Sequence, residues 1–272
     1  MGIKSAIKKC IALMKRKEIV PIVQTPTNEN EFAGKVALIS GGTGGIGLAI
    51  AKSLQKSGCT VVIAGTNERK LHELKEETYM DTIMMDYAKL DSFESIINEV
   101  VHEHGKLDIF VSSAGVHTEN VEFWTMTPEE YDRVMNINLK GTFFICQTIG
   151  KYMRDNKIQG SILLISSSRG SEPAWSPYGL SKWGMKGLVQ GLAKMFIPYG
   201  INVNAIAPGS TATSLIGVKD GDSIYTRENG TYRYIMPEEV ASLSKLLVSD
   251  VGYMINGEII HIAAGRGTFD IR

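Results

Sequence analysis

The chain lacks an excess of charge of either sign, a cysteine motif and any long apolar run. Its 272 residues carry 29 basic and 29 acidic side chains, so no whole-chain basic field favours binding to nucleic acid. Its three cysteines form no C-x-x-C or zinc pattern, and their odd number is typical of a reducing cytoplasm. No apolar run reaches about 18 residues, so we expect no transmembrane segment. We also expect no metal site.

Acidic residues are missing from one segment near the start of the chain. Residues 4–17 contain six basic side chains and no acid, and apolar residues from Ile3 to Met14 recur at helical spacing. Two interpretations remain open for this segment. It is either a helix that docks on a membrane surface or a partner, or an arm that packs on its own domain or on a sister subunit.

Strand-like and helix-like patterns alternate along the rest of the chain. Short β-rich apolar runs predict strands, and the segments between them have helical periodicity. We expect strands at 35–40, 60–64, 82–85, 107–111, 161–165, 201–206 and 258–262, and helices at 45–56, 67–76, 92–104, 128–155, 178–195 and 237–247. This order predicts an α/β fold, a doubly wound Rossmann-type parallel seven-stranded sheet with helices on both faces. The domain would span 34–272, preceded by an arm and linker at 1–33.

Residues 210–236 interrupt the alternation. They are polar, contain glycines and show little periodicity. A long irregular segment inside a compact domain is usually functional or disordered. Because it follows a strand end, we expect a lid over a substrate cleft.

A glycine-rich segment, Ser40-Gly-Gly-Thr-Gly-Gly-Ile-Gly47, joins the first expected strand to the first expected helix. Here Gly41 permits a tight turn, Gly45 lets the backbone approach a pyrophosphate, and Gly47 lets the helix pack close to the sheet. The helix N-terminus offers N–H donors to phosphate oxygens. The segment therefore predicts a dinucleotide cradle, and a glycine-rich turn without a ligand is the alternative.

The end of the second expected strand bears on the choice of cofactor. An acid there would accept a hydrogen bond from the ribose 2′-OH and repel a 2′-phosphate. The chain has Gly65-Thr66-Asn67 at this place, with Arg69 and Lys70 close behind. The absence of a carboxylate favours NADP over NAD, while NAD stays possible.

Tyr178 and Lys182 form the most informative pair in the chain. Tyr178 is the only tyrosine with a lysine four residues on, and this spacing places both side chains on one helix face. A phenol has a reference pKa of about 10, and nearby positive charge from Lys182 and an oxidised nicotinamide would lower it. The pair therefore predicts proton transfer, with Tyr178 as acid in reduction and base in oxidation.

Further motifs stand in register with these two. They are Asp86-Tyr87, Ser112-Ser113-Ala114-Gly115, Asn136-Ile-Asn138-Leu-Lys-Gly141, Ser166-Ser167-Ser168, and Asn204-Ala-Ile-Ala-Pro208-Gly209 with Thr213. From residue 34 to 265 the chain thus resembles the compact single-domain branch of the short-chain dehydrogenase/reductase family, similar to its 3-oxoacyl-carrier-protein reductase-like members. The resemblance implies an NAD(P)-dependent oxidoreductase that transfers a hydride between nicotinamide and a carbonyl or alcohol substrate.

The resemblance also implies the site residues and the assembly. The catalytic set is Asn138, Ser167, Tyr178 and Lys182, with Ser166 and Ser168 as alternatives for the serine. The cofactor-binding set is Gly41, Thr43, Gly45, Ile46, Gly47, Thr66, Asn67, Asp86, Tyr87, Ser113, Ala114, Gly115, Tyr178, Lys182, Pro208, Gly209, Thr211 and Thr213. Family members usually form tetramers or dimers through two long helices, here 127–154 and 176–196.

Three smaller questions stay open at this point. His117 is a candidate to border the substrate, or else a satisfied loop histidine. Arg169 is a candidate to recognise an anionic substrate, or else a solvated loop charge. A non-catalytic nucleotide-sensing or scaffold protein on the same fold is the alternative function. A sugar-nucleotide epimerase or dehydratase is a further one, although its chemistry usually needs a larger C-terminal domain than this chain has.

Overall fold

The computed structural model describes residues 30–218 and 222–268 of the chain. Within these residues, seven parallel strands form one sheet in the order β3-β2-β1-β4-β5-β6-β7. The strands are β1 (Val36–Ser40), β2 (Thr60–Gly65), β3 (Asp81–Met84), β4 (Ile109–Ser112), β5 (Ser161–Ile165), β6 (Asn202–Pro208) and β7 (Ile259–Ile262). This confirms the doubly wound parallel sheet that the sequence predicts. The proposed arm at residues 1–29 lies outside the described residues.

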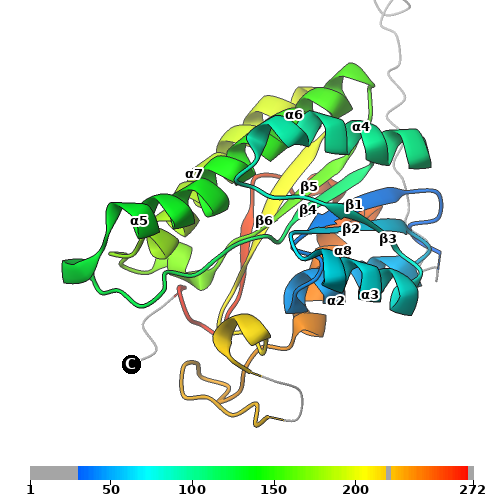
Figure 1. Cartoon of the computed structure of the whole chain (residues 1–272). Coiled ribbons are helices and arrows are strands. Elements are labelled where there is room, and N and C mark those ends of the chain that lie inside the picture. The colour runs from blue at the N-terminus through cyan, green and yellow to red at the C-terminus, as the bar shows by residue number, and fades with distance from the viewer. Residues whose placement is uncertain (1–29, 219–221, 269–272) are drawn as a thin grey trace, which may run out of the picture.

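Helices cover both faces of the sheet (Figure 1). They are α2 (Gly45–Lys56), α3 (Glu68–Thr78), α4 (Phe93–His104), α5 (Pro128–Met135), α6 (Thr142–Asp155), α7 (Pro177–Phe196) and α8 (Pro237–Val248). One core joins the sheet to α4, α6 and α7, and a second joins its other face to α2, α3 and α8. Because both faces are covered, the central strands are apolar throughout, and β1 and β6 are buried along their whole length.

Local signals set the start of the helices that carry the site. The hydroxyl of Ser176 accepts a hydrogen bond from the Gly179 amide, and Pro177 occupies the first turn, so α7 begins one residue before the expected start. The expected helix at 128–155 is interrupted by a π-helical turn, Asn136–Gly141, between α5 and α6. A π turn inserts one extra residue into the helix, and such turns are frequent at functional sites.

Residues 210–236 have little regular structure where the chain is described. They contain a short 3₁₀ turn, Ser214–Ile216, and two isolated β-bridges, Thr211 to Ile235 and Tyr225 to Arg233. The segment follows β6 directly and lies beyond the carboxyl end of that strand (Figure 1). This is the edge of a parallel α/β sheet at which ligands bind. Separately, none of the helices in the described part of the chain has the length and hydropathy needed to cross a membrane.

Candidate functional site

The turn between β1 and α2 is so tightly packed that only glycine fits at its key positions. Gly41 has φ +64°, and a Cβ there would lie 2.7 Å from the Ser113 and Ala114 backbone. A Cβ on Gly47 would lie 2.4 Å from the Gly41 carbonyl oxygen, so this glycine brings α2 against the turn. The turn therefore has the backbone form of a phosphate cradle, with the N-terminus of α2 facing the ligand space.

A cavity of about 560 Å³ opens from this turn along the carboxyl ends of the strands. The predicted cofactor residues that line it are Gly41, Thr43, Gly45, Ile46, Ser113, Ala114, Gly115, Tyr178, Lys182, Pro208, Gly209, Thr211 and Thr213. A Cβ on Gly45 would lie 2.5 Å from the Thr213 methyl group, so Gly45 lets the segment after β6 close against the cradle. The cavity thus has both parts that a dinucleotide needs, a phosphate cradle and a wall for the nicotinamide end.

The predicted cofactor residues at the outer end of the site lie away from this cavity. Thr66 and Asn67 are exposed after β2, and the Asn67 side chain caps α3 by accepting a hydrogen bond from the Lys70 amide. The Asp86 carboxylate accepts one from the Ala88 amide. A cofactor role for these three residues stays a prediction.

The Tyr87 side chain corrects one prediction. It is buried in the core, and its hydroxyl bonds to the Ser40 hydroxyl at 2.7 Å and to the Ser112 hydroxyl at 2.8 Å. Burial raises the pKa of this phenol, which stays protonated. The Tyr87 side chain therefore does not face the cavity, and its hydroxyl instead links Ser40 on β1 to Ser112 on β4.

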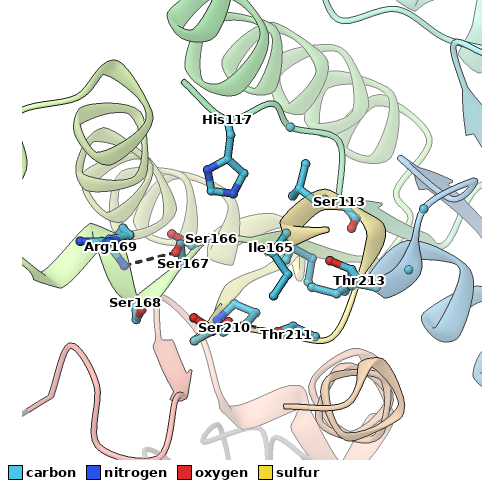
Figure 2. Close-up of a pocket in the computed structure, with 18 of the residues that line it drawn as sticks. Ser113, His117, Ile165, Ser166, Ser167, Ser168, Arg169, Ser210, Thr211 and Thr213 are labelled. Carbon is cyan, nitrogen blue, oxygen red and sulfur yellow. Dashed lines mark hydrogen bonds between the residues drawn. The ribbon is translucent and has the colours of Figure 1, made fainter. Parts of the chain in front are cut away.

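Tyr178, Lys182 and Ser167 meet in the cavity, as the sequence predicts. The Lys182 ammonium donates to the Ile165 carbonyl at 3.0 Å and lies 5.6 Å from the centre of the Tyr178 ring. Ser167 is the partly exposed member of its serine triplet and is the one that acts on the pKa of Tyr178, whereas Ser166 and Ser168 are buried. The geometry thus favours Ser167 over its two neighbours. Figure 2 shows the triplet at the cavity wall.

Burial sets the protonation of this pair. It raises the pKa of Tyr178, against the opposing effects of the Ser167 hydrogen bond and the Arg169 charge. It also lowers the pKa of Lys182 to about 8. The protein groups alone therefore do not lower the Tyr178 pKa as the sequence predicts. A cation next to the phenol, as an oxidised nicotinamide would be, acts in the direction that the chemistry requires.

Asn138 lies in the π turn and is fully buried. Its side chain forms hydrogen bonds with the loop after β4. Its amide oxygen accepts from the Val116 amide at 2.8 Å, and its nitrogen donates to the Val116 carbonyl at 2.9 Å. Its own carbonyl accepts from the Thr142 hydroxyl at 2.8 Å. The side chain therefore fixes the loop after β4, and its predicted catalytic role stays a prediction.

His117 borders the cavity and packs on the ring of Tyr178. The two ring centres are 4.0 Å apart with an angle of 20° between the planes, and Figure 2 shows the imidazole at the cavity. Arg133 holds the loop by donating to the His117 carbonyl at 2.7 Å. Among the described residues, the imidazole has no hydrogen-bond partner. The imidazole therefore borders the cavity beside Tyr178, and a contact between His117 and the substrate stays a prediction.

Sequence reasoning missed several polar residues of the cavity wall. Ser210, Glu228 and Arg266 line the cavity together with Arg169. Glu228 and Arg266 come from segments without a motif, and no spacing relates them to Tyr178. The only signal in the sequence is the irregular character of residues 210–236, from which we expect a lid.

Comparison with known proteins agrees with this geometry. The family model described as short chain dehydrogenase matches residues 35–222. A 3-oxoacyl-acyl-carrier-protein reductase of Rickettsia felis is 36% identical over 241 residues, covering 86% of this chain and 98% of the relative. A 3-ketoacyl-acyl-carrier-protein reductase of Brucella melitensis in complex with NADH has a TM-score of 0.78 at 25% identity, covering 86% of this chain and 99% of that one. A variant of actinorhodin polyketide ketoreductase with NADPH also has a TM-score of 0.78 at 25% identity, covering 86% and 98%.

Proposed function

The chain belongs to the short-chain dehydrogenase family, and from this premise we propose that its cavity reduces a carbonyl group with NADPH, using Tyr178 as the proton donor. The family and the relatives make the protein an NAD(P)-dependent oxidoreductase acting on carbonyl or alcohol groups. Nothing in the comparisons favours the non-catalytic alternative. The proposal concerns the residues, the direction and the choice of cofactor.

The meeting of Ser167, Tyr178 and Lys182 in the same cavity as the glycine cradle carries the proposal. When bound, nicotinamide supplies or accepts the hydride. The Ser167 hydroxyl would donate to the substrate oxygen and stabilise charge that develops there. Tyr178 would donate its phenolic proton to the same oxygen in reduction. Lys182, buried beside the ring, would stabilise the phenolate that remains.

The preference for NADPH is supported by the residues after β2. Thr66 is exposed and no acid occupies its position, so nothing there repels a 2′-phosphate. Glu68 begins α3, but the first turn also carries Arg69 and Lys70. We therefore expect a Thr66→Asp variant to lose affinity for NADPH and to gain affinity for NADH.

Calorimetric titration of the wild type and Thr66→Asp with each cofactor tests this proposal. We expect NADPH to bind the wild type at least about tenfold more tightly than NADH, and the variant to reverse the order. Thr60→Asp is the matched control, because Thr60 is an exposed threonine at the opposite end of β2. Failure of both cofactors to bind below millimolar concentrations would overturn the reductase proposal.

Assembly and location are part of the same proposal. Phe143 on α6 and Leu180, Trp183 and Met195 on α7 are exposed apolar side chains on the two helices through which the family usually assembles. We expect a dimer or tetramer that a Trp183→Glu substitution weakens, as measured by light scattering. A cytoplasmic location fits the free thiols of Cys59 and Cys146, both buried.

A further inference from the structure

One wall of the cavity is made of charged groups from three separate parts of the chain. Arg169 follows β5, Ser210 and Glu228 come from the segment after β6, and Arg266 follows β7. In Figure 2, Arg169 and Ser210 lie along one side of the cavity and His117 lies on another. Neither the glycine cradle nor the proton-transfer pair uses these groups.

Within this wall, Arg266 and Ser210 bind the carboxylate of Glu228. One oxygen of Glu228 accepts from the Arg266 guanidinium at 2.7 Å and also from the Ser210 hydroxyl. The same guanidinium nitrogen donates to the Ser210 oxygen at 3.1 Å. Two donors from different segments therefore converge on one point of the wall, and an anion occupies it. Charge-assisted bonds of this kind are roughly twice as strong as neutral ones.

The two sides of this contact differ in how firmly they are held. The Arg266 side chain is only 18% exposed, and its Nε donates to Glu172 at 2.8 Å. Glu172 in turn accepts from Arg169 at 3.0 Å. The Glu228 side chain is 51% exposed. Among the described residues, its carboxylate accepts hydrogen bonds only from Arg266 and Ser210. A rotation of Glu228 into solvent would leave Arg266 and Ser210 in place, facing the cavity.

We propose that Arg266 and Ser210 form a seat for an anionic group of the substrate, and that Glu228 occupies this seat until the substrate displaces it. The inference rests on the reductase function proposed above and names the substrate class, a carbonyl compound that carries a carboxylate or a comparable anion. Without Glu228, the basic groups Arg169, Lys182 and Arg266 face the cavity, and none of the other described residues that line it is acidic. Such a wall attracts anions.

The protonation of Glu228 agrees with this assignment. The hydrogen bond from Ser210, followed by the charge of Arg266, lowers the pKa of the Glu228 carboxyl, and Arg169 contributes in the same direction. The seat therefore favours the ionised form of a carboxylate. A ligand with the same group would gain the same interactions, while a neutral ester would not.

A pair of probes separates charge from shape. 4-Oxopentanoate and its methyl ester share a ketone at the same distance from the carboxyl carbon, but only the first is an anion. Both are titrated into the full chain saturated with NADP⁺, in which no reduction can occur. We expect Glu228→Gln to raise the affinity for the acid relative to the ester by about tenfold over the wild type, the effect of freeing one charge-assisted bond.

Two further variants control for trivial causes. Glu239→Gln makes the same substitution and breaks the Arg233–Glu239 ion pair, which ties the segment after β6 to α8 outside the cavity. It should leave the acid-to-ester ratio at the wild-type value. Adding Arg266→Gln to Glu228→Gln should abolish the gain, and adding Ser210→Ala gives a milder form of the same test.

The outcomes distinguish the two proposals. An unchanged ratio in Glu228→Gln, or an equal rise in Glu239→Gln, would show that Glu228 only fastens the segment and would overturn the seat. Failure of both probes to bind a protein that still binds NADP⁺ would also overturn the seat but leave the reductase function standing. Failure of NADP⁺ itself to bind would overturn the proposed function instead.

Discussion

The cradle and the charged wall lie in one cavity but are built in different ways. The cradle, residues 40–47, is continuous in sequence and is made by backbone geometry, with a positive φ at Gly41 and close packing at Gly47. The wall, made by Arg169, Ser210, Glu228 and Arg266, is made by side chains that meet only in the folded chain. We propose that the cradle binds the nicotinamide cofactor and that the wall binds the substrate.

The difference decides which substitutions each region tolerates. An added Cβ at Gly41 or Gly47 meets backbone atoms, which cannot move without disturbing the β1–α2 turn. The wall holds Arg169–Glu172, Glu172–Arg266 and Arg266–Glu228 ion pairs with partly exposed members. Ion pairs with an exposed member contribute little to stability, so Arg169 and Glu228 can be exchanged at small cost to the fold. The Glu172–Arg266 pair is largely buried and is costly to break. We therefore expect substitutions in the cradle to destabilise the fold, and substitutions at the exposed wall residues to change mainly which substrate binds.

The largest effect is expected where the two regions meet. Tyr178→Phe removes the phenolic proton donor but keeps the ring, so the turnover number should fall by about 10²–10⁴-fold while NADPH affinity stays close to the wild type. Steady-state rates and calorimetry measure the two quantities. Tyr232→Phe, in an exposed tyrosine outside the cavity, is the control. A variant that keeps its rate would place the acid elsewhere.

The second prediction separates catalysis from stability at Lys182. Burial lowers the pKa of Lys182 from 10.5 to about 8, so the folded state disfavours its charged form. The unfolded chain then binds the extra proton between these pH values, and the stability of the wild type rises with pH across that window. Lys182→Met should remove the penalty and raise the free energy of unfolding at pH 7 by about 3 kcal/mol, while abolishing activity.

Urea unfolding at pH 7 and at pH 10 checks this prediction. The advantage of Lys182→Met should shrink at the higher pH, where the wild-type amine is already neutral in the fold. Lys186→Met, on the same helix but less buried, should show no such pH-dependent gain. A less stable Lys182→Met would mean that its bond to the Ile165 carbonyl outweighs the cost of burying the charge.

The sequence predicted those parts of the molecule that depend on local chemistry. Strand and helix positions followed from periodicity, and the cradle followed from glycines between a strand and a helix. Tyr178 and Lys182 followed from the spacing of one helix turn. Periodicity did not identify the π turn, because its extra residue serves to place Asn138 against the loop after β4.

What the sequence could not show depends on contacts between distant segments. The resemblance places Tyr87 in the cofactor-binding set, but its hydroxyl bonds to Ser40 and Ser112 in the core. Arg266 and Glu228 are 38 residues apart and have no pattern in common. Such groups are recognised only once the fold brings them together.

A smaller effect is expected for substitutions of His117, which borders the cavity from the loop after β4. Its stack on Tyr178 should help to hold the phenol, so His117→Ala should lower the turnover number about tenfold without changing the KM for NADPH. His117→Phe keeps a ring in the same place and should stay within about threefold of the wild type. Equal losses in the two variants would assign the effect to the imidazole nitrogens rather than to the stack.

The same pair of proteins gives a pH test. Burial lowers the pKa of His117 below 6.5, and the charges of Lys182 and Arg169 act in the same direction, against Glu119. The unfolded chain therefore takes up a proton on His117 at higher pH than the folded chain. As pH falls through 6.5, the wild type should lose stability relative to His117→Phe. Parallel stability curves for the two proteins would contradict this.

The smallest expected effect compares backbone strain beside the wall with strain at a distance from the cavity. Ala264, two residues before Arg266, and Tyr79, the C-cap of α3, both have positive φ, 47° and 58°, which disfavours residues other than glycine. Changing either to glycine should raise the free energy of unfolding by up to about 1 kcal/mol, since relief of strain is offset by a more flexible unfolded chain. Thermal unfolding measures both gains.

The two substitutions should differ in function, however. Tyr79 is an exposed helix cap, so Tyr79→Gly should leave binding unchanged. Ala264 lies two residues before Arg266, and a freer backbone there should loosen the guanidinium and weaken binding of 4-oxopentanoate relative to its ester in Glu228→Gln. If Ala264→Gly leaves that ratio intact, the bond from Arg266 to Glu172 is enough to hold the seat. The geometry of the wall would then depend on pairs of side chains alone, whereas that of the cradle depends on its backbone.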